Sequence, residues 1–210
     1  AIVDSGKFPW AQHKARFKRL NEPDVSYHGV VYTEALGAAA YIGRARVVPL
    51  RNMGAAISPF NAFLILQGIE TLALRMPRHC SNAATVAAWL ADRSGVTRVI
   101  HPSQQTGEVR ARADHYLSGG YGGLVGFELA GGMEAGRTFI DNLKLLYHVA
   151  NIGDARSLAI HPASTTHSQL DAEAQLATGV SPGYVRLSIG LEHIDDILAD
   201  LDQALTAAGA

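Results

Sequence analysis

The feature that most constrains the fold is a regular alternation of strand-like and helix-like segments from about residue 71 onward. Four short stretches are rich in β-branched or alternating apolar residues, which is typical of strands: VTRVI (96–100), LVGFEL (124–129), SLAIHP (157–162) and YVRLSIG (184–190). Helical patterns separate them, and the last one places Ile194, Ile197, Leu198 and Leu201 on one face. This order predicts an α/β fold in which helices pack on one sheet.

A long helix precedes this alternation. Ser58 and Pro59 form a typical start, with serine as the N-cap and proline at the first helical position. FNAFLILQGIETLALRM follows and is apolar nearly all round, which predicts a helix buried on most sides. Pro77 is expected to bend or restart the helix, which then continues to Gly95.

The residues before this helix lack the pattern of an independent domain. AIV (1–3) predicts a short strand that breaks at Gly6, and the chain does not open with methionine. We therefore expect the chain to begin partway through a fold. The predicted organisation is a tail of a preceding domain over residues 1–70 and an α/β domain over residues 71–210.

Composition narrows the classes of partner. The formal net charge is −1 and the pI is near 6.8, so we expect neither nucleic acid nor an anionic membrane surface as a partner. No apolar run approaches the roughly 20 residues that span a bilayer, and we expect a cytoplasmic protein. A single cysteine, Cys80, excludes an internal disulfide and is expected to be a buried thiol. His161 and His167 lack metal-site spacing, so no metal is predicted.

Three stretches carry residues that suit a binding site. Arg186 lies inside an otherwise apolar strand, where it pairs either with an internal carboxylate or with the carboxylate of a ligand. The polar stretch ANIGDARSLAIHPASTTHSQ contains Asn151 and Thr166, and it is either a locally bonded turn or a ring of donors around an anion. Arg51 and Asn52 precede the long helix, in a capped corner or at the edge of a cleft.

Taken together, three segments resemble a known family: SPFNAFLILQGIETLALRMPRHCSNA, NIGDARSLAIHPASTTHSQL and GYVRLSIGLEHIDDILADLDQAL. They are similar to the carboxyl-terminal half of the Cys/Met-metabolism enzymes, which use pyridoxal 5'-phosphate (PLP) and have fold type I. The resemblance runs through essentially the whole chain in order. It implies a C-terminal α/β domain with helices on a small, mainly antiparallel sheet, preceded by the tail of the large PLP domain.

The resemblance also implies roles for individual residues. Arg186 matches the arginine that binds the substrate α-carboxylate, Asn151 matches a position that helps to hold it, and Thr166 matches a nearby hydroxyl. Arg51 and Asn52 match a corner that lines the active site. The Schiff-base lysine and the main PLP-binding residues of the family lie upstream of the matched region, so none of the four lysines here is expected to hold the cofactor.

Within the family, the stretch NEPDVSYHGVVYTEALGAAAYIGRARVVPLRNMGA and Asn151 resemble the O-acetylhomoserine sulfhydrylases. That implies PLP-dependent γ-replacement, with sulfide or methanethiol giving homocysteine or methionine, in a homotetramer. Cystathionine γ-synthase, O-succinylhomoserine sulfhydrylase and methionine γ-lyase are the alternatives within the family. The alternative outside enzymes is a stand-alone binding or oligomerisation domain, and the 210-residue chain alone is expected to be inactive.

Overall fold

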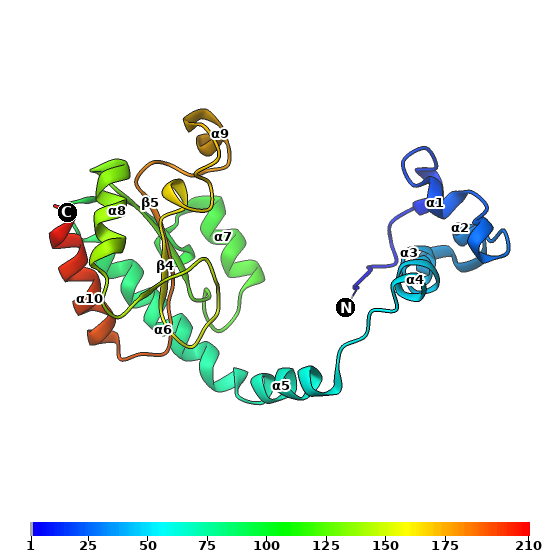
Figure 1. Ribbon diagram of the computed structural model, residues 1–210, viewed down its shortest axis with the longest axis horizontal. Coiled ribbons are helices and arrows are strands. Elements are labelled where there is room, and N and C mark those ends of the chain that lie inside the picture. The colour runs from blue at the N-terminus through cyan, green and yellow to red at the C-terminus, as the bar shows by residue number, and fades with distance from the viewer. Residues whose placement is uncertain (1) are drawn as a thin grey trace. The chain divides into compact units, whose positions relative to one another are not determined.

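The computed structural model describes residues 2–210 and divides the chain into two compact units (Figure 1). Unit 1 is Ala1–Leu66 and unit 2 is Gln67–Ala210, so the division falls four residues before the predicted boundary at residue 70. The interpretation of unit 1 as the tail of a larger domain stays a prediction.

Unit 1 consists of short helical segments. Tyr32 and Leu20 are buried in its small core, and the Tyr32 hydroxyl donates to Asp24 Oδ2 at 2.9 Å. Ile2 and Val3 are exposed and outside any strand, so the predicted opening strand is wrong there, and Ala1 lies outside the described residues. The segments are η1 (Trp10–Gln12), α1 (Lys18–Asn21), η2 (Val25–Tyr27), α2 (Tyr32–Leu36), η3 (Gly37–Ala39), α3 (Ala40–Ala45), the π-helical η4 (Arg46–Leu50) and α4 (Arg51–Met53).

The long apolar stretch forms two helices, α5 (Pro59–Glu70) and α6 (Leu72–Ala91). Ser58 is confirmed as the N-cap, since its Oγ accepts from Asn61 N at 3.1 Å. The interruption lies at Thr71, while Pro77 stays inside α6, which corrects the predicted position of the break. A proline ring clashes with the carbonyl oxygen four residues earlier in a helix. The interruption at Thr71 lies before the turn that Pro77 disturbs in this way.

α5 is exposed along nearly its whole length, contrary to the prediction of a helix buried on most sides. No residue of α5 is buried among residues 2–210, and Phe60 and Leu66 expose 67% and 59% of their surface. The apolar pattern indicates that the helix needs a cover. The described part of the chain does not provide one.

Unit 2 contains a five-stranded mixed sheet, in the order β1-β2-β5-β4-β3. Every neighbouring pair is antiparallel except β3 and β4, which confirms the α/β fold with a mainly antiparallel sheet. The two-residue strand β3 is the one that the sequence patterns missed. The strands are β1 (Val96–Ile100), β2 (Leu124–Leu129), β3 (Tyr147–His148), β4 (Leu158–Ile160) and β5 (Tyr184–Ser188).

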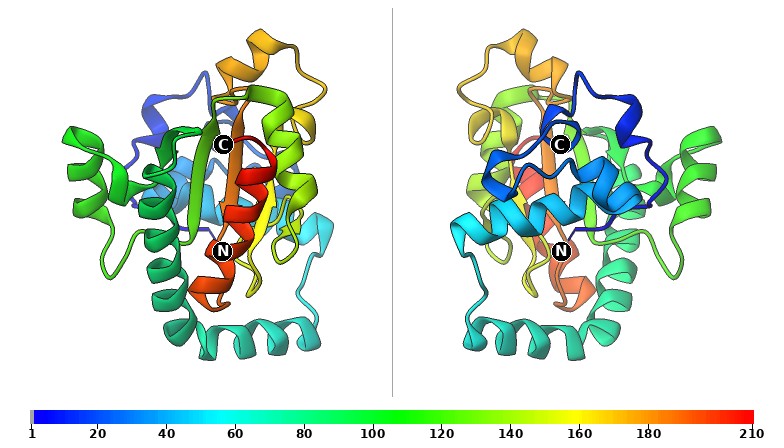
Figure 2. Two further views of the ribbon diagram at one scale, coloured as in Figure 1. Left: turned by 90° about the vertical axis from the view of Figure 1, so that its left-hand side faces the viewer. Right: turned by 90° about the vertical axis from the view of Figure 1, so that its right-hand side faces the viewer.

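One face of this sheet carries the core. Helices α6, α8 and α10 lie side by side against it, as the left view of Figure 2 shows. Phe127 of β2 meets Phe139 of α8 edge to face, with ring centroids 5.4 Å apart. Because side chains alternate along a strand, buried Val185 and Leu187 face the helices, and the residues between them point to the other face. The remaining elements are η5 (Pro102–Gln104), α7 (Gly107–Tyr116), α8 (Gly132–Asn142), η6 (Pro162–Ser164), α9 (Ala172–Ala177) and α10 (Ile194–Ala207).

The helices of residues 2–210 do not meet the requirements of a membrane span. None of them has both the length and the apolar character needed to cross a bilayer.

Candidate substrate-carboxylate site

Arg186 lies in the middle of β5, on the sheet face opposite the helical core. Its Cα pairs with Gly126 of β2 on one side and with Ile160 of β4 on the other. A Cβ at Gly126 would lie 2.8 Å from the Tyr184 hydroxyl oxygen, so the missing side chain leaves room for the tyrosine ring. Burial raises the pKa of Tyr184, and the positive charge of Arg186 opposes that shift.

The guanidinium of Arg186 has almost no partner within the chain. Nη2 donates to the backbone oxygen of Asn151 over a long 3.5 Å, and Arg186 makes no ion pair among residues 2–210. The structure therefore does not support an internal carboxylate as its partner. A guanidinium with unused donors in a fork is suited to a carboxylate supplied from outside.

Asn151 is brought next to Arg186 by the loop between β3 and β4. The two residues are 35 positions apart in the sequence, and their contact is through the Asn151 backbone. The Asn151 side chain is exposed and makes no hydrogen bond within the described chain. Its amide is therefore not used within the described residues.

Thr166 follows η6 in a turn organised by His161. The His161 ring is buried, with Nδ1 2.8 Å from Ser164 Oγ and Nε2 2.7 Å from the Pro182 oxygen. Since a carbonyl only accepts, Nε2 carries the proton in this arrangement. Burial lowers the pKa of His161. The Thr166 hydroxyl contacts His167 Nδ1 at 2.9 Å, and no hydrogen bond within residues 2–210 joins it to Arg186.

Arg51 and Asn52 belong to unit 1, in the short helix α4. Arg51 Nη2 donates to the Ser26 oxygen at 3.2 Å, and its guanidinium lies 5.6 Å from the Tyr27 ring centroid. Asn52 is exposed. Arg186, Asn151 and Thr166 share unit 2, and among these three the hydrogen bond within residues 2–210 joins Arg186 to Asn151.

A cavity of about 440 Å³ opens in unit 1, and one of about 390 Å³ borders the Asn151 loop in unit 2. Gly153 and Ser188 line the second cavity, and Tyr121 contributes to its wall. Among its other lining residues, His79 Nδ1 contacts the Ile189 oxygen at 2.7 Å, and Arg75 Nε donates to Thr71 Oγ1 at 3.2 Å. Cys80 is partly exposed and lies against Gly120, so it is not the fully buried thiol that was expected.

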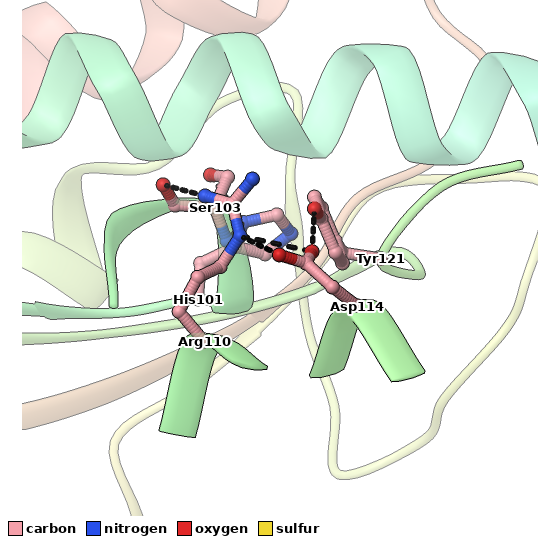
Figure 3. A network of polar contacts seen from close by, with 5 residues as sticks. All are labelled: His101, Ser103, Arg110, Asp114 and Tyr121. Carbon is pink, nitrogen blue, oxygen red and sulfur yellow. Dashed lines mark hydrogen bonds and ion pairs between the residues drawn. The ribbon is translucent and has the colours of Figure 1, made fainter. Parts of the chain in front are cut away.

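Tyr121 is held by a polar network that the sequence analysis missed (Figure 3). Its hydroxyl donates to Asp114, and Arg110 Nε contacts both Asp114 carboxylate oxygens at 3.0 Å. The Tyr121 hydroxyl and then Arg110 lower the pKa of Asp114. His101 lies edge-on to the Tyr121 ring, and burial lowers the His101 pKa. Ser103 Oγ lies 2.7 Å from His101 Nδ1. The network joins α7 to the glycine-rich loop, and within the described residues His101 Nε2 is buried without a hydrogen-bond partner.

The lysines of the described residues lie in open settings. Lys7, Lys14, Lys18 and Lys144 are all exposed, whereas a lysine that forms a Schiff base is activated by an enclosed or electropositive setting. Residues 2–210 also contain no cluster of three or more histidine, cysteine or acidic side chains that could hold a metal ion. What the described chain offers is an arginine without an acidic partner, Arg186, beside the exposed Asn151.

The chain is similar to O-acetyl-L-homoserine sulfhydrylase of Leptospira meyeri, with 51% identity over 213 residues. It is 49% identical to O-acetyl-L-homoserine sulfhydrylase 1 of Thermus thermophilus and 42% identical to homocysteine/cysteine synthase of Saccharomyces cerevisiae. These alignments cover 97%, 98% and 97% of the chain but 48% of each relative. The chain thus spans about half the length of the curated relatives it matches.

A solved structure shares the fold. It comes from Campylobacter jejuni and is assigned as an O-acetylhomoserine (thiol)-lyase, with N'-pyridoxyl-lysine-5'-monophosphate at position 205. The TM-score is 0.79 at 40% identity, over 91% of this chain and 45% of that one. The model of the Cys/Met metabolism PLP-dependent enzymes matches residues 2–206. The chain belongs to this family of PLP-dependent enzymes.

Proposed function

We propose that this chain is the C-terminal portion of an O-acetylhomoserine sulfhydrylase. The complete enzyme would make homocysteine from O-acetylhomoserine and sulfide, or methionine with methanethiol. The observation that carries the proposal is the partly buried Arg186, which has no carboxylate partner among residues 2–210 and lies against Asn151. The names of the relatives, two sulfhydrylases and a homocysteine/cysteine synthase, support the reaction class.

In this proposal, Arg186 and Asn151 bind and orient the amino-acid substrate. The guanidinium fork receives the α-carboxylate, and the Asn151 amide donates to one of its oxygens. Two anchored points fix the direction of the substrate relative to the cofactor, which favours reaction through positioning. Thr166 would add a hydroxyl near this site, and Arg51 and Asn52 would line its entrance.

The proposal places the Schiff-base lysine and the main PLP-binding groups outside these 210 residues. The four exposed lysines support this placement, and so does the 48% coverage of the relatives. The chain alone is then inactive. A homotetramer in the cytoplasm is part of the proposal, and the uncovered apolar surface of α5 supports further contacts with other polypeptide.

The experiment is a product assay on the full-length polypeptide that contains these residues, loaded with PLP. We expect homocysteine from O-acetylhomoserine and sulfide, and little product from O-succinylhomoserine. Preferred use of the succinyl ester, formation of cystathionine from cysteine, or elimination from methionine would replace the proposal with one of the three related activities. No turnover of any of these substrates would favour a binding or oligomerisation role.

The 210-residue chain provides a complementary test. It is mixed with PLP, reduced with borohydride and analysed by intact mass and peptide mapping. We expect no site-specific pyridoxyl adduct. A single modified lysine at full occupancy would show that this chain holds the cofactor itself.

A further inference from the structure

The loop that carries Asn151 is tied to the end of β5 by a series of hydrogen bonds. The Gly153 N–H donates to Ser188 Oγ at 3.0 Å, close to the contact between Asn151 and Arg186. After the end of β5, the Leu191 N–H donates to a backbone oxygen of this loop, that of Ala155, at 2.8 Å. The loop therefore takes its position from β5 and the residues after it.

The end of the loop at Ser157 is held by more hydrogen bonds than the end at Asn151. Glu192 accepts from Ser157 N at 2.6 Å and from Ser157 Oγ at 2.9 Å, and Ser157 Oγ accepts from the Gly190 N–H at 2.8 Å. Ser157 is fully buried. Bonds to an ionised carboxylate are stronger than neutral ones, so this end is an anchor. Near Asn151, by contrast, the loop is held by the 3.0 Å bond to Ser188 Oγ and by the long 3.5 Å bond from Arg186.

Ser188 and Arg186 are two residues apart on one strand, so their side chains point to the same face of the sheet. Asn151 and Gly153 are likewise two apart on the loop. The contacts of Arg186 with Asn151 and of Ser188 with Gly153 thus form two neighbouring links between the same segments. Ser188 is 4% exposed, so water competes little for its bond.

We propose that Ser188 is a positioning residue that sets the distance between Asn151 and Arg186 for the substrate carboxylate. This inference rests on the proposed function of those two residues. The hydroxyl holds the loop through the Gly153 N–H, and it acts on the substrate only through Asn151. Without it, the amide of Asn151 is free to move away from the guanidinium, and the carboxylate loses one of its two anchors.

The test uses Ser188→Val and Ser188→Thr in the full-length PLP-loaded enzyme. Valine and threonine have nearly the same shape, and only threonine keeps the hydroxyl. Ser188 borders the 390 Å³ cavity, so the added methyl group has room. For Ser188→Val we expect KM for O-acetylhomoserine to rise about three- to tenfold, the value of one hydrogen bond, with kcat within about twofold. Ser188→Thr should restore KM.

Ser181→Ala is the matched control, because the Ser181 Oγ is buried without a hydrogen-bond partner in the described chain. It should leave KM unchanged. A Ser188→Val variant with unchanged KM overturns the inference, and so does a Ser188→Thr variant as impaired as Ser188→Val. Arg186→Lys is measured beside them, and unchanged KM in that variant would overturn the proposed function instead.

Hydrogen exchange of the Gly153 amide gives a readout that does not depend on turnover. In the wild-type protein we expect this amide to be protected by Ser188, and in Ser188→Val to exchange about tenfold faster or more. Protection that persists in Ser188→Val shows that the loop does not need the hydroxyl, which overturns the inference. Faster exchange in Ser188→Val with protection restored in Ser188→Thr supports it.

Discussion

Replacing Asp200 with alanine should strongly destabilise unit 2, because one buried carboxylate organises the turn between α8 and β3. Asp200 lies on α10 and is 6% exposed. Its Oδ1 accepts from Lys144 N at 2.8 Å, and its Oδ2 accepts from Leu145 N and Leu146 N at 2.9 and 3.0 Å. This turn leads through β3 to the loop that carries Asn151.

The expected magnitude follows from the three backbone donors that the alanine leaves without a partner. Each buried donor that loses its acceptor costs about 1–3 kcal/mol, and entry of water into the space offsets part of the sum. We expect Asp200→Ala to lower the free energy of unfolding by about 3–5 kcal/mol. Asp200→Asn keeps one acceptor oxygen, and it should cost about half as much.

The assay is urea unfolding of the purified chain, followed by circular dichroism and tryptophan fluorescence. Asp202→Asn is the control, because Asp202 is on the same helix but exposed, in a 3.6 Å ion pair with Arg93. Such a surface pair is worth about 0–1 kcal/mol. A loss below about 1 kcal/mol for Asp200→Ala would refute the reasoning, since it would mean that the backbone donors find other partners.

Three further predictions concern stability. Burial lowers the pKa of His101 and His161 below the ordinary value of 6.5, so below pH 6.5 the unfolded chain binds more protons than the folded chain. The urea midpoint should therefore fall as the pH drops from about 6.5 toward the folded-state pKa values, and these two groups should leave it unchanged above pH 6.5. A midpoint that rises on acidification would contradict this prediction. Gly136→Ala places a Cβ against the His161 ring and should cost about 1–3 kcal/mol by thermal unfolding, whereas a neutral effect would show that the ring moves aside freely. Tyr121→Phe removes the hydroxyl bond to exposed Asp114 and should change the unfolding free energy by less than about 1 kcal/mol, so a larger loss would show that the network is structural.

The strands of unit 2 were predictable where they were long enough to show a pattern. β1 and β2 appear over the residues that the patterns indicated, because β-branched residues and alternation are local signals. β3 has only two residues, and its pairing with β4 depends on the fold around it. The apolar α5 shows the limit of such patterns, since a sequence indicates that a helix needs burial without showing what covers it.

The sequence patterns pointed to Arg186 individually, and to Asn151 and Thr166 only as parts of a polar stretch. Arg186 stands out as a charge inside an apolar strand. Tyr184 and Ser188 could have been found from their spacing of two along the same strand. The contact with Asn151 could not, because the loop reaches Arg186 through bonds made by Ser188 and Glu192 across 35 residues of sequence.

The central claim is that Arg186 binds the α-carboxylate of the substrate. The most direct measurement is steady-state kinetics of Arg186→Lys in the full-length PLP-loaded enzyme, with Arg98→Lys as the control for an exposed arginine that is already paired with Glu128. Loss of a bidentate charged contact costs about 2–5 kcal/mol, so kcat/KM for O-acetylhomoserine should fall at least thirtyfold, with a raised KM. An Arg186→Lys enzyme with wild-type KM and kcat would contradict the account.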